Sequence, residues 1–189
     1  MWIAGANPRA YLTREQVAEL AGHAARWELI VFLAYTGLRW DEATGLRVRH
    51  VDLKRRRVSV EENAVGVGSF IEIGTPKTHE KCQVPYPAFL VTMQTLVAGK
   101  DRNDIVFGEG RIHVRRPTAT TGWFNSAVGR AQEKSAAAIT AALAAGEQPP
   151  RPFPRVTPLD LRHTAASLAI SAGANVKAFS EYWATPPPR

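Results

Sequence analysis

The sequence predicts an α+β fold that is mostly helical, with a small three-stranded antiparallel sheet inserted early in the chain. Apolar residues recur at helical spacing before residue 50 and again after residue 88, which is typical of amphipathic helices. Residues 51–87 instead alternate between polar and apolar and are rich in β-branched side chains, as strands are. The length of 189 residues suits one domain with a buried core.

The first helices are predicted from their end signals. Thr13 and Gln16 have the spacing of a capping box, so a helix should begin near Arg14. A second helix, RWELIVFLAYT, should end at Gly37, because glycine readily adopts the left-handed conformation that closes helices. A third, short helix should carry RWDEATGL.

Three strands and three further helices should follow. The stretches VDLKRRRVSVEE, SFIEIG and KCQVPYP are each expected to form one strand of the sheet. Helices should then span residues 88–98, 121–145 and 159–172. The segment GEQPPRPFPRVTP holds five prolines and should form the loop before the last helix.

The chain is strongly basic. It has 24 lysines and arginines against 17 acidic residues, a formal net charge of +7 and a pI near 10.0. This balance favours a polyanionic partner, of which nucleic acid is the commonest. A protein that is merely basic is the alternative that charge alone leaves open.

The remaining composition indicates where such a protein would work. The single cysteine, Cys82, excludes an internal disulfide and fits a reducing compartment. The start, MWIAGANPRA, lacks the basic region and apolar run of a signal peptide. The longest apolar run, residues 29–35, is far shorter than the roughly 20 residues of a membrane span. We therefore expect a cytoplasmic protein that does not act at a membrane.

Two arginines lie where they could bind a phosphate. Arg39 opens the third helix, where its guanidinium and nearby backbone N–H groups could face an anion. Glu42 lies on the same helical face and could hold that guanidinium, although an exposed Arg–Glu pair of little consequence is the alternative. Arg162 lies in the first turn of the last helix, which Thr157 or Asp160 could cap. The alternative is an arginine that merely packs and is solvated.

Lys77 and the histidines are the other candidates. Lys77 lies in GTPKTHEK, at a turn between two predicted strands, where it could reach into a groove and donate a proton. A solvated turn lysine is the alternative. His163 is interpreted as a core or surface histidine, and the other histidines show no metal-ligand spacing, so no metal-binding or cofactor-binding residue is predicted.

Considered together, these motifs resemble those of one family. TGLRWDEATGLRVRHVDL, then TPKT, then DLRHTAASLAISAGANVKA are similar in order and content to the tyrosine recombinases, the phage integrases. The resemblance runs from about Tyr11 to Lys177 and is looser around Lys77. It implies a recombinase catalytic domain, double-stranded DNA as the partner, and DNA integration and recombination by strand cleavage and rejoining.

The resemblance also implies a role for each residue. In this family a tyrosine hydroxyl attacks a DNA phosphodiester and forms a 3′-phosphotyrosyl link, while two arginines stabilise the negative charge on the phosphate. A lysine protonates the departing 5′-oxygen, and a histidine assists. Arg39 and Arg162 would be the catalytic arginines, Lys77 the catalytic lysine and Glu42 a supporting carboxylate. No metal, cofactor or small-molecule ligand is expected.

The sequence departs from the family pattern at three points. The second motif of the family reads His-x-x-Arg, but Leu159 stands three residues before Arg162 and cannot transfer a proton. The Leu-Gly-His segment and the nucleophilic tyrosine that should follow are not visible. A separate helical domain that clamps the other side of the DNA is also missing before Tyr11.

The codons of the last residues suggest why the Leu-Gly-His segment and the tyrosine are not visible: the reading frame has shifted. Read one base earlier, those of Tyr182 and Trp183 can only yield leucine, and those of Trp183 and Ala184 can only yield glycine. We therefore interpret residues 1–178 as an incomplete catalytic domain and residues 179–189 as an out-of-frame, disordered tail. On this interpretation Tyr182 is not the nucleophile.

The sequence thus predicts a truncated, phage- or prophage-type integrase fragment that is inactive because it lacks the segment with the nucleophilic tyrosine. One alternative is a non-catalytic DNA-binding protein that occupies recombination sites or interferes with an intact integrase. Another is an active recombinase whose tyrosine is unrecognised or comes from a partner. In each case Arg39, Lys77 and Arg162 are expected to converge on one basic surface.

Overall fold

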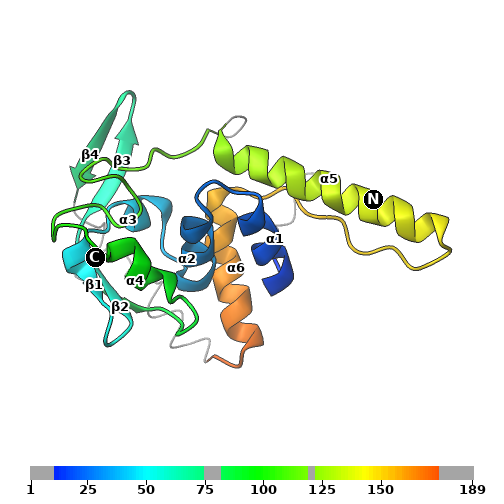
Figure 1. Cartoon of the computed structure of the whole chain (residues 1–189), viewed down its shortest axis with the longest axis horizontal. Coiled ribbons are helices and arrows are strands. Elements are labelled where there is room, and N and C mark those ends of the chain that lie inside the picture. The colour runs from blue at the N-terminus through cyan, green and yellow to red at the C-terminus, as the bar shows by residue number, and fades with distance from the viewer. Residues whose placement is uncertain (1–10, 75–81, 119–121, 175–189) are drawn as a thin grey trace, which may run out of the picture.

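The computed structural model describes residues 11–74, 82–118 and 122–174 (Figure 1). Its helices are α1 (Arg14–Gly22), α2 (Trp27–Thr36), α3 (Trp40–Thr44), α4 (Thr92–Val97), α5 (Trp123–Ala144) and α6 (Pro158–Ser171), with a 3-10 turn over Val48–His50. Its strands are β1 (Val51–Asp52), β2 (Arg57–Val60), β3 (Asn63–Val67), β4 (Phe70–Gly74) and β5 (Cys82–Pro85).

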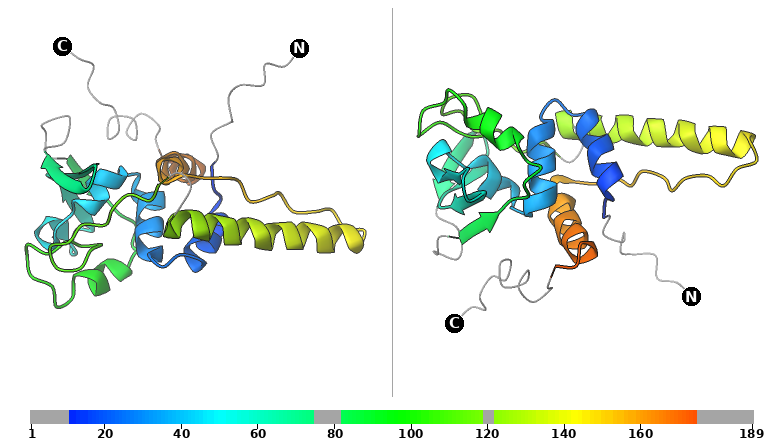
Figure 2. Two further views of the ribbon diagram at one scale, coloured as in Figure 1. Left: turned by 90° about the horizontal axis from the view of Figure 1, so that it is seen from above. Right: turned by 60° about the horizontal axis from the view of Figure 1, so that its bottom comes forward.

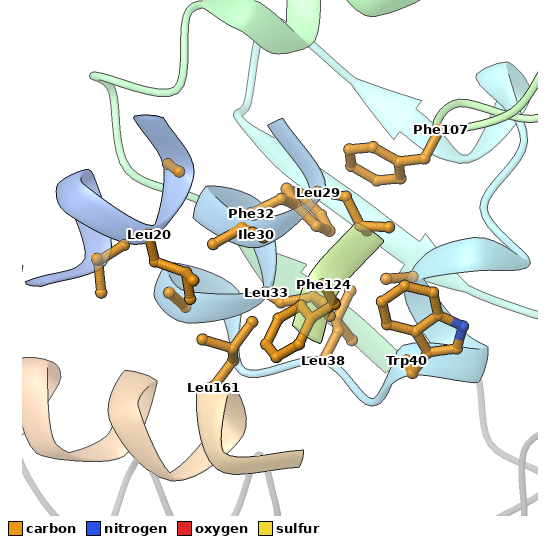
Figure 3. Packing of buried hydrophobic residues seen from close by; sticks show 14 of the residues in the cluster. Leu20, Leu29, Ile30, Phe32, Leu33, Leu38, Trp40, Phe107, Phe124 and Leu161 are labelled. Carbon is orange, nitrogen blue, oxygen red and sulfur yellow. The ribbon is translucent and has the colours of Figure 1, made fainter. Parts of the chain in front are cut away.

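The core is built around α2. This helix is apolar on nearly every side, and such a helix is stable only when it is surrounded. α1 and α6 pack against it, and Figure 3 shows Phe124 of α5 and Leu161 of α6 beside Leu33 of α2. Phe124 and Leu161 have no exposed surface. Residues from both ends of the chain therefore share one core.

The predicted end signals of the first helices are confirmed. The backbone N–H of Thr13 donates to Oε1 of Gln16 over 3.0 Å, and the N–H of Gln16 donates to Oγ1 of Thr13 over 3.2 Å. Gly37 ends α2 with a φ of 68°, in the left-handed region. α4 is shorter than the expected helix over residues 88–98, because the chain around Leu90 forms a turn instead.

The prediction of a three-stranded antiparallel sheet is confirmed, and each predicted stretch forms strand, but the first stretch is divided in two and SFIEIG pairs outside this sheet. The stretch VDLKRRRVSVEE forms two strands, β1 and β2, because the Asp52 side chain accepts the N–H of Arg55 and turns the chain back. β5 completes this sheet beside β2. β4 belongs to a separate hairpin with the unpredicted strand β3, closed at Gly68 with a φ of 57°. β3 was not predicted because Gly66 within it and Gly68 just after it are residues that strands disfavour.

A close approach of two segments places the β3–β4 hairpin beside α3. A Cβ atom at Gly45, which follows α3, would lie 2.8 Å from the carbonyl oxygen of Glu62 and 3.2 Å from the backbone nitrogen of Ala64. No side chain fits there. The absence of a side chain at Gly45 thus lets the start of β3 rest on the end of α3, the helix that carries Glu42.

α5 leaves the body of the protein. Its first two turns bury Phe124, Ala127, Val128 and Ala131, after which the helix projects outward as an arm, and the chain returns beside it (Figures 1 and 2). The returning segment is attached where the N–H of Phe153 donates to Oγ of Ser135 over 2.9 Å. Within the described residues, none of the helices is both long enough and apolar enough to cross a membrane.

Candidate functional site

Arg39 and Glu42 are positioned by the start of α3. Arg39 is the residue that caps this helix, and its backbone N–H donates to Oε2 of Glu42 over 2.7 Å. Its guanidinium donates to Oε1 of the same carboxylate over 3.3 Å. The structure therefore has Glu42 holding the Arg39 guanidinium, as the sequence predicts. The Arg39 side chain is 42% exposed, so a ligand can reach it.

Arg162 reaches the same carboxylate from the other end of the chain. Thr157 caps α6, with its N–H 2.8 Å from Oδ2 of Asp160, so the first turn of that helix is well defined. From the start of the next turn Arg162 Nη1 donates to the carbonyl oxygen of Gly37 over 3.0 Å and lies 3.8 Å from Oε2 of Glu42. The glycine that ends α2 thus also helps to hold Arg162.

Glu42 forms ion pairs with both arginines, and its side chain and that of Arg162 are largely buried. The exposed fractions of the Glu42 and Arg162 side chains are 12% and 16%. Burial lowers the pKa of Arg162, and the Glu42 carboxylate opposes that shift. Because the carboxylate touches both guanidiniums, it orients the two donor forks toward one region although they are 123 positions apart in the sequence. The structure therefore confirms that Arg39 and Arg162 converge.

The two arginines line a small pocket of about 70 Å³, which we call the arginine pocket. It is formed by residues of three segments: Leu38, Arg39, Trp40, Asp41, Arg116, Pro158, Leu159 and Arg162. A single water needs on the order of 10–15 Å³ by this measure, so the space admits a group larger than water, such as a phosphate. Leu159 is 52% exposed here and brings an apolar edge to the pocket.

Sequence reasoning missed Arg116 and Asp41. Both line the arginine pocket, but the segment around Arg116 has neither helical nor strand periodicity, so no pattern points to it. Burial raises the pKa of Asp41, and the nearby charge of Arg116 counters that shift. Only the tertiary structure brings the loop of Arg116 to the starts of α3 and α6.

Lys77 lies outside the described residues, so its convergence with the arginines stays a prediction. The strand that follows it, β5, begins at Cys82. Burial raises the pKa of the Cys82 thiol, and the charges of Glu42 and Arg162 also act on it. The start of β5 is therefore close to the arginine pocket. Tyr182 and the interpreted boundary after residue 178 also lie outside the described residues.

The described part of the chain contains no cluster of His, Cys, Asp and Glu side chains that could hold a metal ion. His163 is partly exposed, and neither His163 nor His113 lines the arginine pocket; Nδ1 of His113 instead bonds to the carbonyl oxygen of Thr44 over 2.9 Å. The chemistry that the pocket offers is therefore recognition of an anion by guanidinium groups.

The fold is similar to those of solved recombinases. It aligns with the integrase of transposon Tn1549, solved in complex with a circular intermediate DNA, with a TM-score of 0.60 and 18% identity over 96% of this chain and 59% of that one. For XerA recombinase the TM-score is 0.55, with 20% identity over 94% and 56% of the two chains. For the integrase from mycobacterium phage Brujita it is 0.54, with 19% identity over 94% and 50%.

These comparisons settle the fold and the family. The chain spans 50–59% of the length of these three structures. A search of curated proteins finds no match. The model of the phage integrase family, by contrast, matches residues 10–184, which is nearly the whole chain. The expected α+β fold of a tyrosine recombinase catalytic domain is confirmed, and the chain belongs to the phage integrase family of tyrosine recombinases.

Proposed function

We propose that this protein binds the phosphate backbone of double-stranded DNA in the arginine pocket, as a fragment of a site-specific recombinase that cleaves and rejoins DNA strands. The observation that carries the proposal is the bridge from Glu42 to Arg39 and Arg162. One carboxylate fixes two planar forks, and the forks match the geometry of phosphate oxygens. The formal net charge of +7 supports a polyanionic partner.

The arrangement supports stabilisation of a phosphate that gains negative charge. Arg162 is mostly buried, so its charge is poorly screened by water, and Arg39 is exposed enough to meet a large ligand. Lys77, by its place in the family motif, would supply the proton to the leaving oxygen.

We further propose that the chain binds DNA without cleaving it. Of the tyrosines in the described residues, Tyr11, Tyr35 and Tyr86, none lines the arginine pocket. Leu159, which replaces the family histidine, cannot move a proton. On the interpretation that Tyr182 is not the nucleophile, the covalent route has no first step. Such a protein could occupy recombination sites or compete with an intact integrase for them.

Binding is tested with a double-stranded DNA fragment by fluorescence anisotropy over a series of salt concentrations. The apparent affinity should fall steeply with salt, and Arg39→Ala should reduce the slope of log K against log salt by about 0.9, the share of one phosphate contact. Arg55→Ala removes the same charge from an exposed turn outside the pocket and serves as the matched control. An unchanged slope in Arg39→Ala would refute the proposed phosphate site.

Cleavage is tested by incubating the protein with a nicked duplex that traps covalent intermediates, followed by denaturing electrophoresis. No covalent protein–DNA adduct should form, and Tyr182→Phe should behave as the parent does. An adduct in the parent that disappears in Tyr182→Phe would show that Tyr182 is the nucleophile and that the protein is active.

A further inference from the structure

The arginine pocket contains one guanidinium that the family motifs do not explain. Arg39 comes from the start of α3 and Arg162 from near the start of α6, and both belong to recognised motifs. Arg116 comes from the segment between α4 and α5 and lines the same pocket. Leu159 lines the same pocket as Arg116. The guanidinium of Arg116 can donate hydrogen bonds, whereas the side chain of Leu159 cannot.

The loop that carries Arg116 is attached on its N-terminal side by three successive residues. His113 bonds through Nδ1 to the carbonyl oxygen of Thr44, at the end of α3, over 2.9 Å. Val114 is 8% exposed and packs in the core. The guanidinium of Arg115 donates to the carbonyl oxygen of Ser69, in the turn of the β3–β4 hairpin. These contacts fix the backbone just before Arg116, so its place at the pocket is built into the fold.

The charged side chains in and around the pocket leave a net charge of one, which suits a ligand with a single negative charge. The guanidiniums of Arg39, Arg116 and Arg162 face two carboxylates, those of Asp41 and Glu42. With both carboxylates ionised, one positive charge is left over, which matches the single negative charge of a phosphodiester. Glu42 is already engaged by Arg39 and Arg162, whereas Arg116 is exposed and interacts electrostatically with Asp41.

We propose that Arg116 is a third phosphate-binding residue of this site, which donates to the DNA phosphate from the loop that lines the arginine pocket together with the two motif arginines. This inference rests on the proposed function, since it names a further residue for the same phosphate. Both Leu159 and Arg116 line the pocket, and of the two only Arg116 can donate hydrogen bonds. The competing explanation is that Arg116 serves only as a counter-charge for Asp41.

The test compares Arg116→Ala, Arg116→Lys and Arg55→Ala in the DNA-binding assay over a series of salt concentrations. Arg116→Ala should lower the slope of log K against log salt by about 0.9, and Arg116→Lys should keep the slope, because the charge remains, but bind more weakly because the fork is lost. Arg55→Ala should match the parent. A parent-like slope and affinity in Arg116→Ala would overturn the inference.

Two further comparisons distinguish a failure of the proposed function from a failure of the proposed role of Arg116. If Arg39→Ala lowers the slope and Arg116→Ala does not, the proposed function stands and the role of Arg116 falls; if neither lowers it, both fall. In an Asp41→Asn background, Arg116→Ala should still lower the slope by about 0.9. Loss of the effect in that background would show that Arg116 acts only on Asp41. Urea unfolding of each variant verifies that the protein remains folded.

Discussion

The two ends of α6 lie in opposite kinds of surroundings. Its first turn faces the arginine pocket, where Arg162 meets Glu42 and the carbonyl oxygen of Gly37. Its later turns line a larger groove of about 510 Å³, most of whose surface is apolar, which we call the apolar groove. The lining of this groove consists of Arg14, Tyr35, Pro87, Phe89, Ala165, Leu168, Ala169 and Ala172.

The difference shows two ways in which one helix can shape a surface. At the first turn, hydrogen bonds and charges fix the direction of single side chains, so the pocket is small and specific. Along the later turns the surface is mostly apolar, and contact with it is largely non-directional. Leu161 lies in the core beneath the first turn and is fully buried, so it supports the helix that serves both regions.

The largest effect should come from Leu161→Ala, which disturbs the shared support. Truncating a fully buried leucine removes its packing and leaves a cavity, so the free energy of unfolding should fall by about 2–5 kcal/mol. Urea unfolding followed by circular dichroism measures this loss. A decrease below about 1 kcal/mol would mean that α6 is not held by the core as described.

Glu42→Gln should disturb the pocket while leaving the groove intact. The carboxylate is 12% exposed and contacts two guanidiniums, so its neutralisation should lower the free energy of unfolding by about 1–3 kcal/mol. Glu72→Gln, at an exposed position on β4, is the matched control and should stay within about 0.5 kcal/mol of the parent. Equal effects of the two changes would contradict a structural role for the bridge.

Phe89→Ala should alter the groove and spare the pocket. Phe89 is 57% exposed, and its ring meets that of Tyr35 edge-on with centroids 4.7 Å apart. Loss of this contact should cost about 0.5–1.5 kcal/mol. The fluorescence of a dye that binds apolar surfaces should decrease, while DNA affinity should stay unchanged. Phe70→Ala, in the exposed hairpin, controls for loss of an aromatic ring elsewhere. A change in DNA affinity would show that the two regions are coupled.

Leu159→His should have the smallest effect. Leu159 is 52% exposed, so the free energy of unfolding should change by no more than about 0.5 kcal/mol. The variant restores the family histidine, yet under the proposed function it should form no covalent adduct with a nicked duplex, because an acid–base group cannot take the place of a nucleophilic tyrosine. Appearance of an adduct in this variant would show that a tyrosine is already in place and that only the histidine was lacking.

Local signals account for what could be predicted from the sequence. The capping box of Thr13 and Gln16, the helix end at Gly37 and the start of α6 each depend on residues within four positions of one another. The pairing of Glu42 with Arg39 has the same local origin, because i,i+3 neighbours share a helix face. The family motifs then allowed the convergence of Arg39 with Arg162 to be predicted as well.

The tertiary structure decided the features that depend on distant segments. β3 and the pairing of β4 with it could not be predicted, because strand partners are chosen by packing rather than by the strand's own sequence. Arg116 reaches the pocket only because contacts at Thr44, in the core and at Ser69 hold its loop. By itself, the sequence determined helices, caps and the two motif arginines, since those follow from neighbouring residues. The third arginine and the apolar groove arise from packing of segments far apart in the chain, which no local pattern encodes.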